Sequence, residues 1–372
     1  MKVLFAIDSL QQGGAEQSIA HIIRHFSKET QVNILYFYPK ADLLSTYQEL
    51  GCSIISLNLQ GKYDFVKGIA GMKKVLQDLK PDIVVTSLYR SNIISRMACV
   101  LTGTKLVGTF VDDSYNIERR KTFIGVSGFI KYYSTWFLDR ITSFIPCLWI
   151  ANSKYIGDSN AKHLGIPTSK IKVIYRGRNS DDFSEWEKPE SDIFTFVCIG
   201  RLYEKKGYPE LIEAFSIIAK KNSKVNLVIY GEGSYRPQME KQILDFNLQG
   251  QIILAGNIPN AWQEMYKAHC FVFPSRFEGF SGALVEAMMT GIPIISSDIP
   301  MNLEAVENNK TALVHKLKNA TDLADKMQEM ISNYEPMIEM GKIARKVAIE
   351  KFDIKKIAQQ YEGVLVAVSN IK

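Results

Sequence analysis

The stretch RFEGFSGALVEAMMTGIP, residues 276–293, contains a pattern that recurs along the chain. On either side of it lie two short β-rich runs, CFVFP (270–274) and PIISS (293–297). Within it, Ala283 to Thr290 has the composition of a short apolar helix that Gly291 and Pro293 bring to an end. The stretch therefore predicts a strand, a loop, a helix and a further strand in succession, which is the repeating unit of a parallel sheet.

Two glutamates in this stretch, Glu278 and Glu286, stand eight residues apart among apolar neighbours. Glu278 falls on the loop and Glu286 inside the helix, about 7 Å from a helix start near Ser281 at about 1.5 Å of rise per residue. Free amides at a helix N-terminus attract anions, phosphate above all. The stretch could therefore hold a phosphate at the helix start and hydroxyl groups beside each carboxylate, as a sugar nucleotide requires. The alternative is an ordinary strand–helix unit with one exposed and one salt-bridged glutamate.

The whole chain repeats this alternation of strands and helices in two series. The first series consists of VLFAI (3–7), VNILYFY (32–38), SIISL (53–57), DIVVTS (82–87), KLVGTF (105–110) and LWIANS (148–153). The second consists of FTFVCIG (194–200), VNLVIYG (225–231), QIILAG (251–256), CFVFP (270–274) and PIISS (293–297). Between them the polar stretch 178–192 is interpreted as a linker.

The predicted fold is therefore α/β, with two doubly wound Rossmann-like domains facing across a cleft in which ligands bind at the carboxyl ends of the strands. We expect an N-terminal domain over residues 1–180 and a C-terminal domain over residues 181–353. The last helix, within residues 354–372, is expected to pack back on the N-terminal domain. A chain of 372 residues is long enough for two cores of this size.

Composition and charge narrow the class of protein. The chain is 46% hydrophobic and 23% charged, as in ordinary globular proteins, and its five cysteines are scattered without a C-x-x-C pair. With no signal-peptide pattern and no apolar run of about 18 residues, a cytoplasmic location is expected. The first 185 residues hold 23 Lys and Arg against 16 Asp and Glu, whereas the remainder is close to neutral. Because no basic cluster is interleaved with aromatics in an RNA-binding pattern, nucleic acid is not an expected partner.

Glycines and cations follow the first strand-like run of each series. Gly13 and Gly14 in DSLQQGGAEQ directly precede a helix, where bare backbone lets a phosphate or a sugar approach closely, although a plain turn is the alternative. The loop IGRLYEKKGYPE carries Arg201 and Lys206, a planar fork and a point charge that suit a diphosphate; the alternative is a solvated basic turn. Neither loop carries the G-x-G-x-x-G pattern of a nicotinamide site.

Taken in order, several motifs of this chain resemble retaining glycosyltransferases of the GT-B fold, glycosyltransferase family 4 (group 1). The motifs are GGAEQ, VGTFVDD, IYRGRNSDDF, IGRLYEKKG, VIYGEG and FPSRFEGFSGALVEAMMTGIPIISSD. The likeness spans nearly the whole chain and is strongest from Phe194 to Asp298, where the two glutamates reproduce the family's E-x7-E motif.

The resemblance implies a role for each candidate residue. Glu286 would bond the ribose hydroxyls of the donor nucleotide and Glu278 the donor hexose, while Arg201 and Lys206 would hold the diphosphate. Backbone around Gly279 and amides of Phe280, Ser281 and Gly282 would meet donor oxygens, with Gly14 completing the donor site.

The chain departs from the family pattern in three places. Where many members carry His-Asp, this chain has Val111-Asp112, so Asp112 is the expected acceptor-side catalytic residue, with Asp113 as the alternative. Arg176-Gly177 replaces the usual N-G of the linker motif, and Ser281 replaces a helix-start glycine while still supplying an amide.

By this resemblance the chain is expected to transfer a hexose or N-acetylhexosamine from a nucleotide diphosphate sugar, most commonly a UDP-sugar, to a glycan acceptor. We also expect retention at the anomeric carbon, a lipid-linked acceptor and a place in cell-surface polysaccharide biosynthesis. The reaction is expected to require neither a metal nor a cofactor. Two alternatives stay open: a sugar-nucleotide epimerase or hydrolase of GT-B shape, and a non-catalytic sugar-binding subunit.

The stretch RRKTFIGVSGFIKYYSTWFLDRITSFI, residues 119–145, interleaves basic and aromatic side chains and has two interpretations. It could settle into the headgroup layer of an anionic membrane and hold the enzyme peripherally on the inner face of the plasma membrane. Alternatively its aromatics belong to the core of the N-terminal domain and its cations are solvated.

Overall fold

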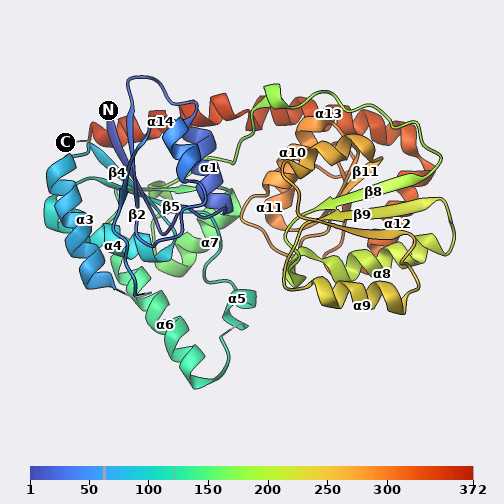
Figure 1. Cartoon of the computed structure of the whole chain (residues 1–372), viewed down its shortest axis with the longest axis horizontal. Coiled ribbons are helices and arrows are strands. Elements are labelled where there is room, and N and C mark those ends of the chain that lie inside the picture. The colour runs from blue at the N-terminus through green and yellow to red at the C-terminus, as the bar shows by residue number, and fades with distance from the viewer. Residues whose placement is uncertain (62–63, 122, 372) are drawn as a thin grey trace. The chain divides into compact units, whose positions relative to one another are not determined.

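The computed structural model describes residues 1–61, 64–121 and 123–371, and the side chains of all of these except 117 and 118. Its chain divides into two compact units (Figure 1). Unit 1 comprises Met1–Gly177 together with Ile354–Lys372, and unit 2 comprises Arg178–Asp353. Each unit is a parallel sheet with helices packed on it, so the prediction of two doubly wound α/β domains is confirmed.

Unit 1 contains a seven-stranded sheet in the order β3-β2-β1-β4-β5-β6-β7, and all its neighbouring strands run parallel. The strands are β1 (Lys2–Ile7), β2 (Gln31–Tyr36), β3 (Ser53–Ser56), β4 (Ile83–Ser87), β5 (Leu106–Phe110), β6 (Leu148–Ala151) and β7 (Ile171–Val173). The helices are α1 (Gly14–Ile23), α2 (Leu44–Glu49), α3 (Phe65–Leu79), α4 (Tyr89–Thr102), α5 (Ile117–Lys121), α6 (Gly125–Thr142), α7 (Lys154–Leu164) and α14 (Ile354–Ser369).

The two faces of this sheet are buried under different helices. Val3, Phe5 and Ile7 of β1 pack on the face that α1 and α14 cover, whereas Leu4 and Ala6 pack on the face that α3 and α4 cover. Successive side chains of a strand point to opposite faces, so both must be apolar when both faces are covered. This is why the strands of the chain are continuous apolar runs.

Helix α14 belongs to unit 1 although it follows unit 2 in the sequence. Ile357, Tyr361 and Leu365 lie on its buried face within the same core as α1 and β1. On the polar side, the carboxylate of Glu362 accepts hydrogen bonds from the Ser27 and Thr30 hydroxyls. The chain therefore returns to unit 1 through one amphipathic helix.

Unit 2 contains a six-stranded sheet in the order β10-β9-β8-β11-β12-β13, also parallel throughout. The strands are β8 (Phe194–Ile199), β9 (Val225–Tyr230), β10 (Ile252–Gly256), β11 (Cys270–Phe273), β12 (Ile294–Ser297) and β13 (Leu313–His315). The helices are α8 (Tyr208–Ala219), α9 (Arg236–Asp245), α10 (Gly282–Thr290), α11 (Pro300–Leu303), α12 (Ala320–Ser332) and α13 (Tyr334–Phe352).

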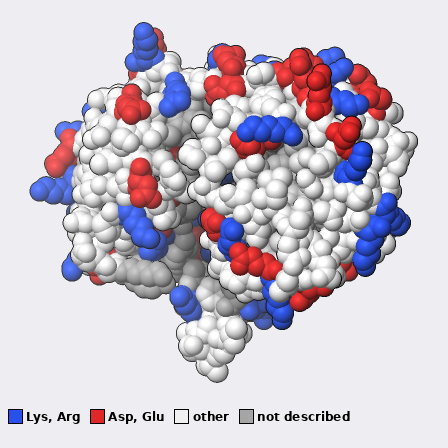
Figure 2. Space-filling model, turned by 45° about the vertical axis from the view of Figure 1, so that its right-hand side comes forward, with Lys and Arg blue, Asp and Glu red and all other residues white. Residues whose placement is uncertain are grey.

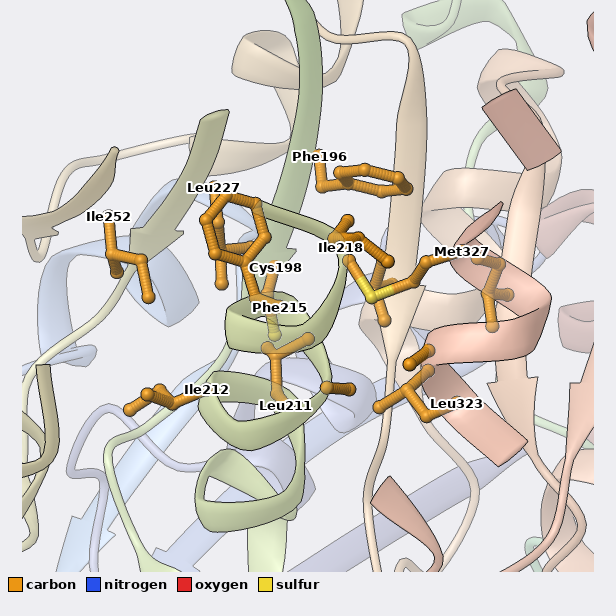
Figure 3. Packing of buried hydrophobic residues seen from close by; sticks show 14 of the residues in the cluster. Phe196, Cys198, Leu211, Ile212, Phe215, Ile218, Leu227, Ile252, Leu323 and Met327 are labelled. Atoms are coloured by element: carbon orange, nitrogen blue, oxygen red, sulfur yellow. The ribbon is translucent and has the colours of Figure 1, made fainter. Parts of the chain in front are cut away.

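The core of unit 2 lies between its sheet and helices α8 and α12. Figure 3 shows Phe196 and Leu227 of the sheet near Phe215 of α8 and Met327 of α12. On the other side of the unit, α10 packs against α13. The sheet thus holds β8 and β11 side by side as its central pair, and their carboxyl ends carry the loops of the candidate site.

The stretch 178–192, interpreted from its polar composition as a linker, belongs to unit 2 in the structure. Phe183 and Trp186 are buried there, and the indole of Trp186 donates to the carbonyl of Ala268 over 3.0 Å. Two large aromatic side chains bury enough apolar surface to anchor a short segment despite its charged neighbours. The chain crosses between the units at Gly177–Arg178.

Candidate functional site

The loops that follow β8 and β11 bring Lys206 and Glu278 into contact. Lys206 ends a single 3₁₀ turn, Glu204–Lys206, and Glu278 lies in the loop between β11 and α10. The Lys206 ammonium donates to a Glu278 carboxylate oxygen over 2.5 Å, and the Ser275 hydroxyl donates to the same oxygen over 2.7 Å. Both charged side chains are largely buried, with 16% and 13% of their surface exposed. The pair forms the polar centre of the candidate site.

Backbone contacts hold these two loops together. Gly207 has a φ of +76°, and a Cβ placed on it would lie 2.0 Å from the carbonyl oxygen of Pro274. Only a glycine therefore lets the β8 loop pass so close to the β11 loop. The amide of Arg276 donates to the carbonyl of Lys205 over 2.8 Å, which ties the loops a second time. Their contact makes the Lys206–Glu278 pair a fixed part of unit 2.

The surroundings of Glu278 favour its charged form. Burial alone would raise the pKa of this carboxyl, but the ammonium of Lys206 and the hydrogen bonds from Lys206 and Ser275 hold the pKa below its usual range. Glu278 is therefore a carboxylate at neutral pH. A charged carboxylate accepts hydrogen bonds from sugar hydroxyls, and the Lys206 ammonium carries three donors, of which this contact uses one.

Helix α10 begins as its sequence predicts. Ser281 is its N-cap and its hydroxyl accepts from the amide of Leu284, while Gly291 ends the helix with a φ of +86°. Phe280 is buried beside the helix start, edge-on to Phe352 at a centroid distance of 5.4 Å. The first-turn amides of such a helix have no acceptor within the helix itself. The segment of Gly279, Phe280, Ser281 and Gly282 thus brings peptide donors next to Glu278.

Glu286 lies one turn into α10 and contacts a cation that the sequence interpretation left in the linker. The Nε of Arg178 donates to Oε1 of Glu286 over 2.7 Å, and both side chains are mostly buried. Arg178 is held in turn by its own amide, which donates to the carbonyl of Phe352 over 3.0 Å. Both glutamates of the motif are therefore paired with cations, which differs from the alternative of one exposed and one salt-bridged glutamate.

Arg201 follows β8 in the same loop as Lys206, but its side chain is exposed. The guanidinium lies 5.3 Å from the ring centroid of Tyr203. The two cations that the sequence groups together therefore differ in setting: Lys206 is fixed by an ion pair, and Arg201 stands at the surface.

In unit 1, Gly14 is the first residue of α1. A Cβ placed on Gly14 would lie 3.5 Å from the guanidinium nitrogens of Arg176, so Arg176 covers the start of this helix. The departure from the family pattern at Arg176 thus adds a cation beside the glycine loop.

The neighbouring aspartates after β5 have different surroundings. Asp113 is buried, and its carboxylate accepts from the Ser159 hydroxyl over 2.7 Å and from the amide of Tyr115 over 3.2 Å. Asp112 is 40% exposed, and the guanidinium of Arg119 lies 3.4 Å from its carboxylate. The carboxylate of Asp113 is thus committed to the fold, and Asp112 is the one that a ligand can reach.

A cavity of about 350 Å³ opens at the carboxyl ends of β1 and β4 in unit 1. Aromatic and basic side chains dominate its lining: Tyr89, Arg90, Tyr115, Arg119, Phe123, Lys131 and Tyr132. At its floor, Asp8 accepts from Arg90 and Ser91, each over 2.9 Å. Leu88, also in the lining, has a φ of +75°, an unusual backbone conformation for a side chain of this type.

Sequence reasoning missed three contributors to these sites: Arg178, Ser275 and the Asp8–Arg90 pair. Arg178 lies two residues after Arg176, which the motif comparison did single out. Its partner is 108 residues away, so sequence spacing alone could not connect them.

The structure describes residues 1–61, 64–121 and 123–371. No group of three or more His, Cys, Asp or Glu side chains there is arranged to hold a metal ion. Within the same ranges, each helix is too short or too polar to cross a bilayer.

The chain matches two models of known protein families. A family model described as "Glycosyltransferase Family 4" matches residues 12–182, and one described as "Glycosyl transferases group 1" matches residues 179–347. The chain is 26% identical over 238 residues to an uncharacterised glycosyltransferase of Methanocaldococcus jannaschii, in an alignment that covers 60% of this chain and 57% of that protein. The match therefore spans little more than half of that relative's length.

Two further likenesses extend over almost the whole chain. A Campylobacter jejuni N-acetylgalactosamine-N,N'-diacetylbacillosaminyl-diphospho-undecaprenol 4-alpha-N-acetylgalactosaminyltransferase is 24% identical over 367 residues, which is 95% of this chain and 96% of that protein. Among solved structures, that of Anabaena Alr3699/HepE in complex with UDP superposes with a TM-score of 0.83 at 18% identity, covering 99% of this chain and 100% of that one. At this identity the structural likeness establishes a shared fold.

Proposed function

Because this chain belongs to the group 1 glycosyltransferases of family 4, we propose that it transfers a hexose or an N-acetylhexosamine from a UDP-sugar to a glycan acceptor. The observation that carries this proposal is the buried Lys206–Glu278 pair beside the start of α10. It combines a cation for the diphosphate, a carboxylate for the sugar hydroxyls and peptide donors for anionic oxygens. An ordinary strand–helix unit needs none of these together.

In this proposal the donor binds along unit 2. Lys206 and Arg201 contact the diphosphate, and the backbone of Gly279 and the amides of Phe280, Ser281 and Gly282 meet donor oxygens. Glu278 accepts from hexose hydroxyls and Glu286 from the ribose hydroxyls. A carboxylate has two oxygens, so the Arg178 contact to Oε1 of Glu286 is compatible with a ribose on the other oxygen. Gly14 is also proposed to contact the donor, because its backbone carries no side chain.

The proposed reaction proceeds with retention at the anomeric carbon and without a metal. The acceptor oxygen forms a bond to the anomeric carbon on the face from which the diphosphate leaves, and the carbon–phosphate oxygen bond breaks. The acceptor's proton passes to the leaving phosphate oxygen, so no separate base is needed. Lys206 and Arg201 stabilise the charge that grows on the diphosphate, which makes catalysis mainly electrostatic stabilisation and positioning.

The acceptor is proposed to bind unit 1 at the carboxyl ends of its strands, where Asp112 contacts an acceptor hydroxyl. The exposure of Asp112 beside buried Asp113 supports this choice. A lipid-linked glycan is the proposed acceptor class, and cell-surface polysaccharide biosynthesis at the cytoplasmic face of the membrane the proposed setting. The name of the Campylobacter relative, a transferase for a diphospho-undecaprenol acceptor, supports the acceptor class.

Donor binding is the first test. A thermal-shift comparison of UDP-, GDP- and ADP-sugars with the full chain should show stabilisation by a UDP-sugar, in line with the UDP complex of the Anabaena protein. Incubation of that donor alone, analysed for sugar products, separates the alternatives. A new sugar nucleotide formed in the absence of acceptor would identify an epimerase. Release of free sugar as fast as sugar is transferred when acceptor is present would identify a hydrolase. Binding of the donor without any turnover, with or without acceptor, would identify a sugar-binding subunit.

Metal independence has its own test. Transfer to an acceptor from a bacterial lipid extract should persist in excess EDTA, because two protein cations already neutralise the diphosphate. If EDTA abolishes transfer and magnesium or manganese restores it, the metal-free mechanism is wrong.

A further inference from the structure

Helix α6 of unit 1 has an apolar face that points away from its unit. The exposed side chains on it are Val126, Phe129, Ile130, Phe137 and Ile141, and we refer to these five as the α6 face. At about 100° per residue they fall within an arc of about 120°. Ile124 just before the helix and Phe144 just after it are exposed as well. An ordinary surface helix turns its apolar stripe inward, so this face requires an explanation.

The opposite side of the same helix fixes its orientation. Asp139 is buried there and accepts from Arg96 over 2.6 Å and from the Tyr115 hydroxyl over 2.5 Å. The hydroxyl of Tyr132, also buried, donates to the carbonyl of Tyr115 over 3.1 Å. Breaking a buried ion pair of this kind is energetically costly, because it leaves an uncompensated charge in the interior. The α6 face is therefore outward because the polar side is locked inward, and rotation of the helix cannot hide it.

Residues 119–145 thus contribute some aromatic side chains to the interior and others to the surface. Tyr132 belongs to the interior of unit 1, whereas Phe129, Ile130 and Phe137 stand at the surface. Figure 1 shows α6 extending from the sheet of unit 1, and Figure 2 shows its far end as a lobe without charged side chains on the side in view.

The exposed charges that residues 119–144 contribute beside this face are basic. Residues 119–144 contain five basic side chains, Arg119, Arg120, Lys121, Lys131 and Arg140, and all five are exposed. The single acidic residue in this stretch, Asp139, is buried in its ion pair with Arg96. Exposed apolar and aromatic side chains bordered by cations match the boundary between the acyl chains and the anionic headgroups of a membrane.

From these observations we propose that the α6 face and its flanking cations bind the surface of an anionic lipid bilayer. The apolar side chains enter the headgroup layer and the basic ones pair with lipid phosphates. A second copy of the chain would bring the same five cations together, which electrostatic repulsion opposes. The bilayer is therefore the occupant that the charge pattern favours.

The same surface leads to the cavity at the carboxyl ends of β1 and β4. Phe123 and Lys131 line the cavity, and Lys131 also lies on α6. If the chain is the transferase proposed above, docking of the α6 face on the bilayer would bring this cavity to the headgroup of a lipid-linked acceptor. Membrane binding itself needs neither donor nor acceptor, so its failure and the failure of the transferase proposal can be told apart.

The experiment is sedimentation of the full chain with vesicles. Vesicles of equal parts phosphatidylcholine and phosphatidylglycerol should carry most of the protein down at low salt, and vesicles of phosphatidylcholine alone should carry at least tenfold less. One molar salt should release the protein, because the screening length falls to about 3 Å. No sedimentation at low salt, or equal binding to both vesicle types, would overturn the proposal.

Matched variants locate the binding surface. F129S/I130S removes two side chains that are 55% and 61% exposed, and is expected to weaken binding at least tenfold. V100S/L101S on α4 removes two that are 58% and 57% exposed and should bind like wild type. For the charges, R120S/K121S should weaken binding, whereas K67S/K74S on α3, also exposed, should have no effect.

Each variant is checked by circular dichroism and by size-exclusion chromatography without lipid. Wild-type binding by F129S/I130S, or equal loss in V100S/L101S, would place the contact elsewhere and overturn the proposal. A lipid-free dimer that F129S/I130S dissociates would identify a second copy as the occupant and overturn it too.

Discussion

Each glutamate of the motif in unit 2 has its own basic partner, and the two partners come from different parts of the chain. Glu278 contacts Lys206 from the loop after β8, and Glu286 contacts Arg178 from the segment that enters the unit. A buried carboxylate depends on such a partner, because an unpaired charge in the interior is costly. Substitution of either cation is therefore expected to act through the glutamate that it contacts.

Replacing Lys206 by Ala should lower turnover by an amount equivalent to about 2–4 kcal/mol of transition-state stabilisation, the scale for one preorganised donor. It should also lower the free energy of unfolding, since Glu278 then keeps a buried charge without its ammonium partner. Arg201→Ala should lower turnover comparably and leave stability unchanged, because Arg201 is exposed. Steady-state kinetics measure turnover, and urea unfolding measures stability. If either variant keeps activity within twofold of wild type, the replaced residue does not stabilise the leaving diphosphate as proposed.

The stability effect of Lys206→Ala should depend on pH. In the wild type the pKa of Glu278 lies below its usual range, so the stability that its charge contributes is present at neutral pH and is lost as the pH falls through that lowered pKa. In the variant, burial without the Lys206 ammonium raises the pKa of Glu278. The loss in free energy of unfolding relative to wild type should therefore be largest at pH 7 and shrink toward about pH 4, near the ordinary pKa of a glutamate. Urea unfolding at both pH values measures it. The control compares K206A/E278Q with E278Q: neither protein has the Glu278 carboxyl, so the cost of losing Lys206 should not depend on pH in this range.

Arg178 is expected to position Glu286 for the nucleotide. Arg178→Ala should weaken binding of UDP about tenfold, on the scale of one hydrogen bond to a charged group, because the Glu286 carboxylate loses the contact that orients it. Arg178→Lys keeps the charge without the planar guanidinium, so its affinity for UDP should lie between those of R178A and wild type. Isothermal titration with UDP measures the affinity. Unchanged affinity in R178A would show that Glu286 is oriented by other contacts.

At the scale of elements, the candidate site depends on loops that meet backbone to backbone. The loop after β8 crosses the loop after β11 at Gly207, where the carbonyl of Pro274 occupies the space of a side chain. The helix that follows, α10, begins at its Ser281 cap and ends at Gly291. Strand ends, a cap and a close approach together determine where the Lys206 and Glu278 side chains meet.

Gly207→Ala should therefore disrupt the site rather than only the loop. The new Cβ would lie 2.0 Å from a backbone oxygen at a φ of +76°, so the two loops must move apart and the Lys206–Glu278 contact must lengthen. Both the melting temperature and the affinity for UDP should fall. Gly250→Ala is the matched control, since a Cβ there meets nothing within 4 Å and its φ is not positive. Equal behaviour of the two variants would argue against this reasoning.

In the whole molecule each unit has its own core, and helix α14, which follows unit 2 in the sequence, contributes to the core of unit 1. Ile357, Tyr361 and Leu365 of α14 occupy the face of the sheet that α1 also covers. Removal of their packing should affect unit 1 first, because the core of unit 2 is a separate cluster.

Leu365→Ala should destabilise unit 1 by about 2–5 kcal/mol, the usual cost of emptying a buried leucine site. The neighbouring Val366 is 41% exposed, so Val366→Ala should change stability by less than about 0.5 kcal/mol. Scanning calorimetry with and without UDP measures both. UDP is proposed to bind unit 2, so it should raise the melting temperature of unit 2 only. In L365A the melting temperature of the other transition, that of unit 1, should fall. A fall confined to the transition that UDP stabilises would contradict the assignment of α14 to unit 1.

The sequence determined the fold class and singled out Lys206, Glu278 and Glu286 in unit 2's candidate site, but not Arg178 or Ser275. Apolar runs alternating with amphipathic segments specify parallel sheets, because strands covered on both faces must be apolar throughout. Ser281 and Gly291 mark the ends of α10 in the sequence and in the structure, since capping is a local interaction. The E-x7-E spacing likewise identified Glu278 and Glu286 before their surroundings were known.

The tertiary structure decided which partner each of these residues contacts. Arg178 and Glu286 lie 108 residues apart, and Lys206 and Glu278 lie 72 apart, so folding rather than spacing brings them together. It also separated Asp112 from buried Asp113, and turned Phe129 outward and Tyr132 inward on one helix. Burial depends on what packs against a residue from elsewhere in the chain, and no local pattern contains that information.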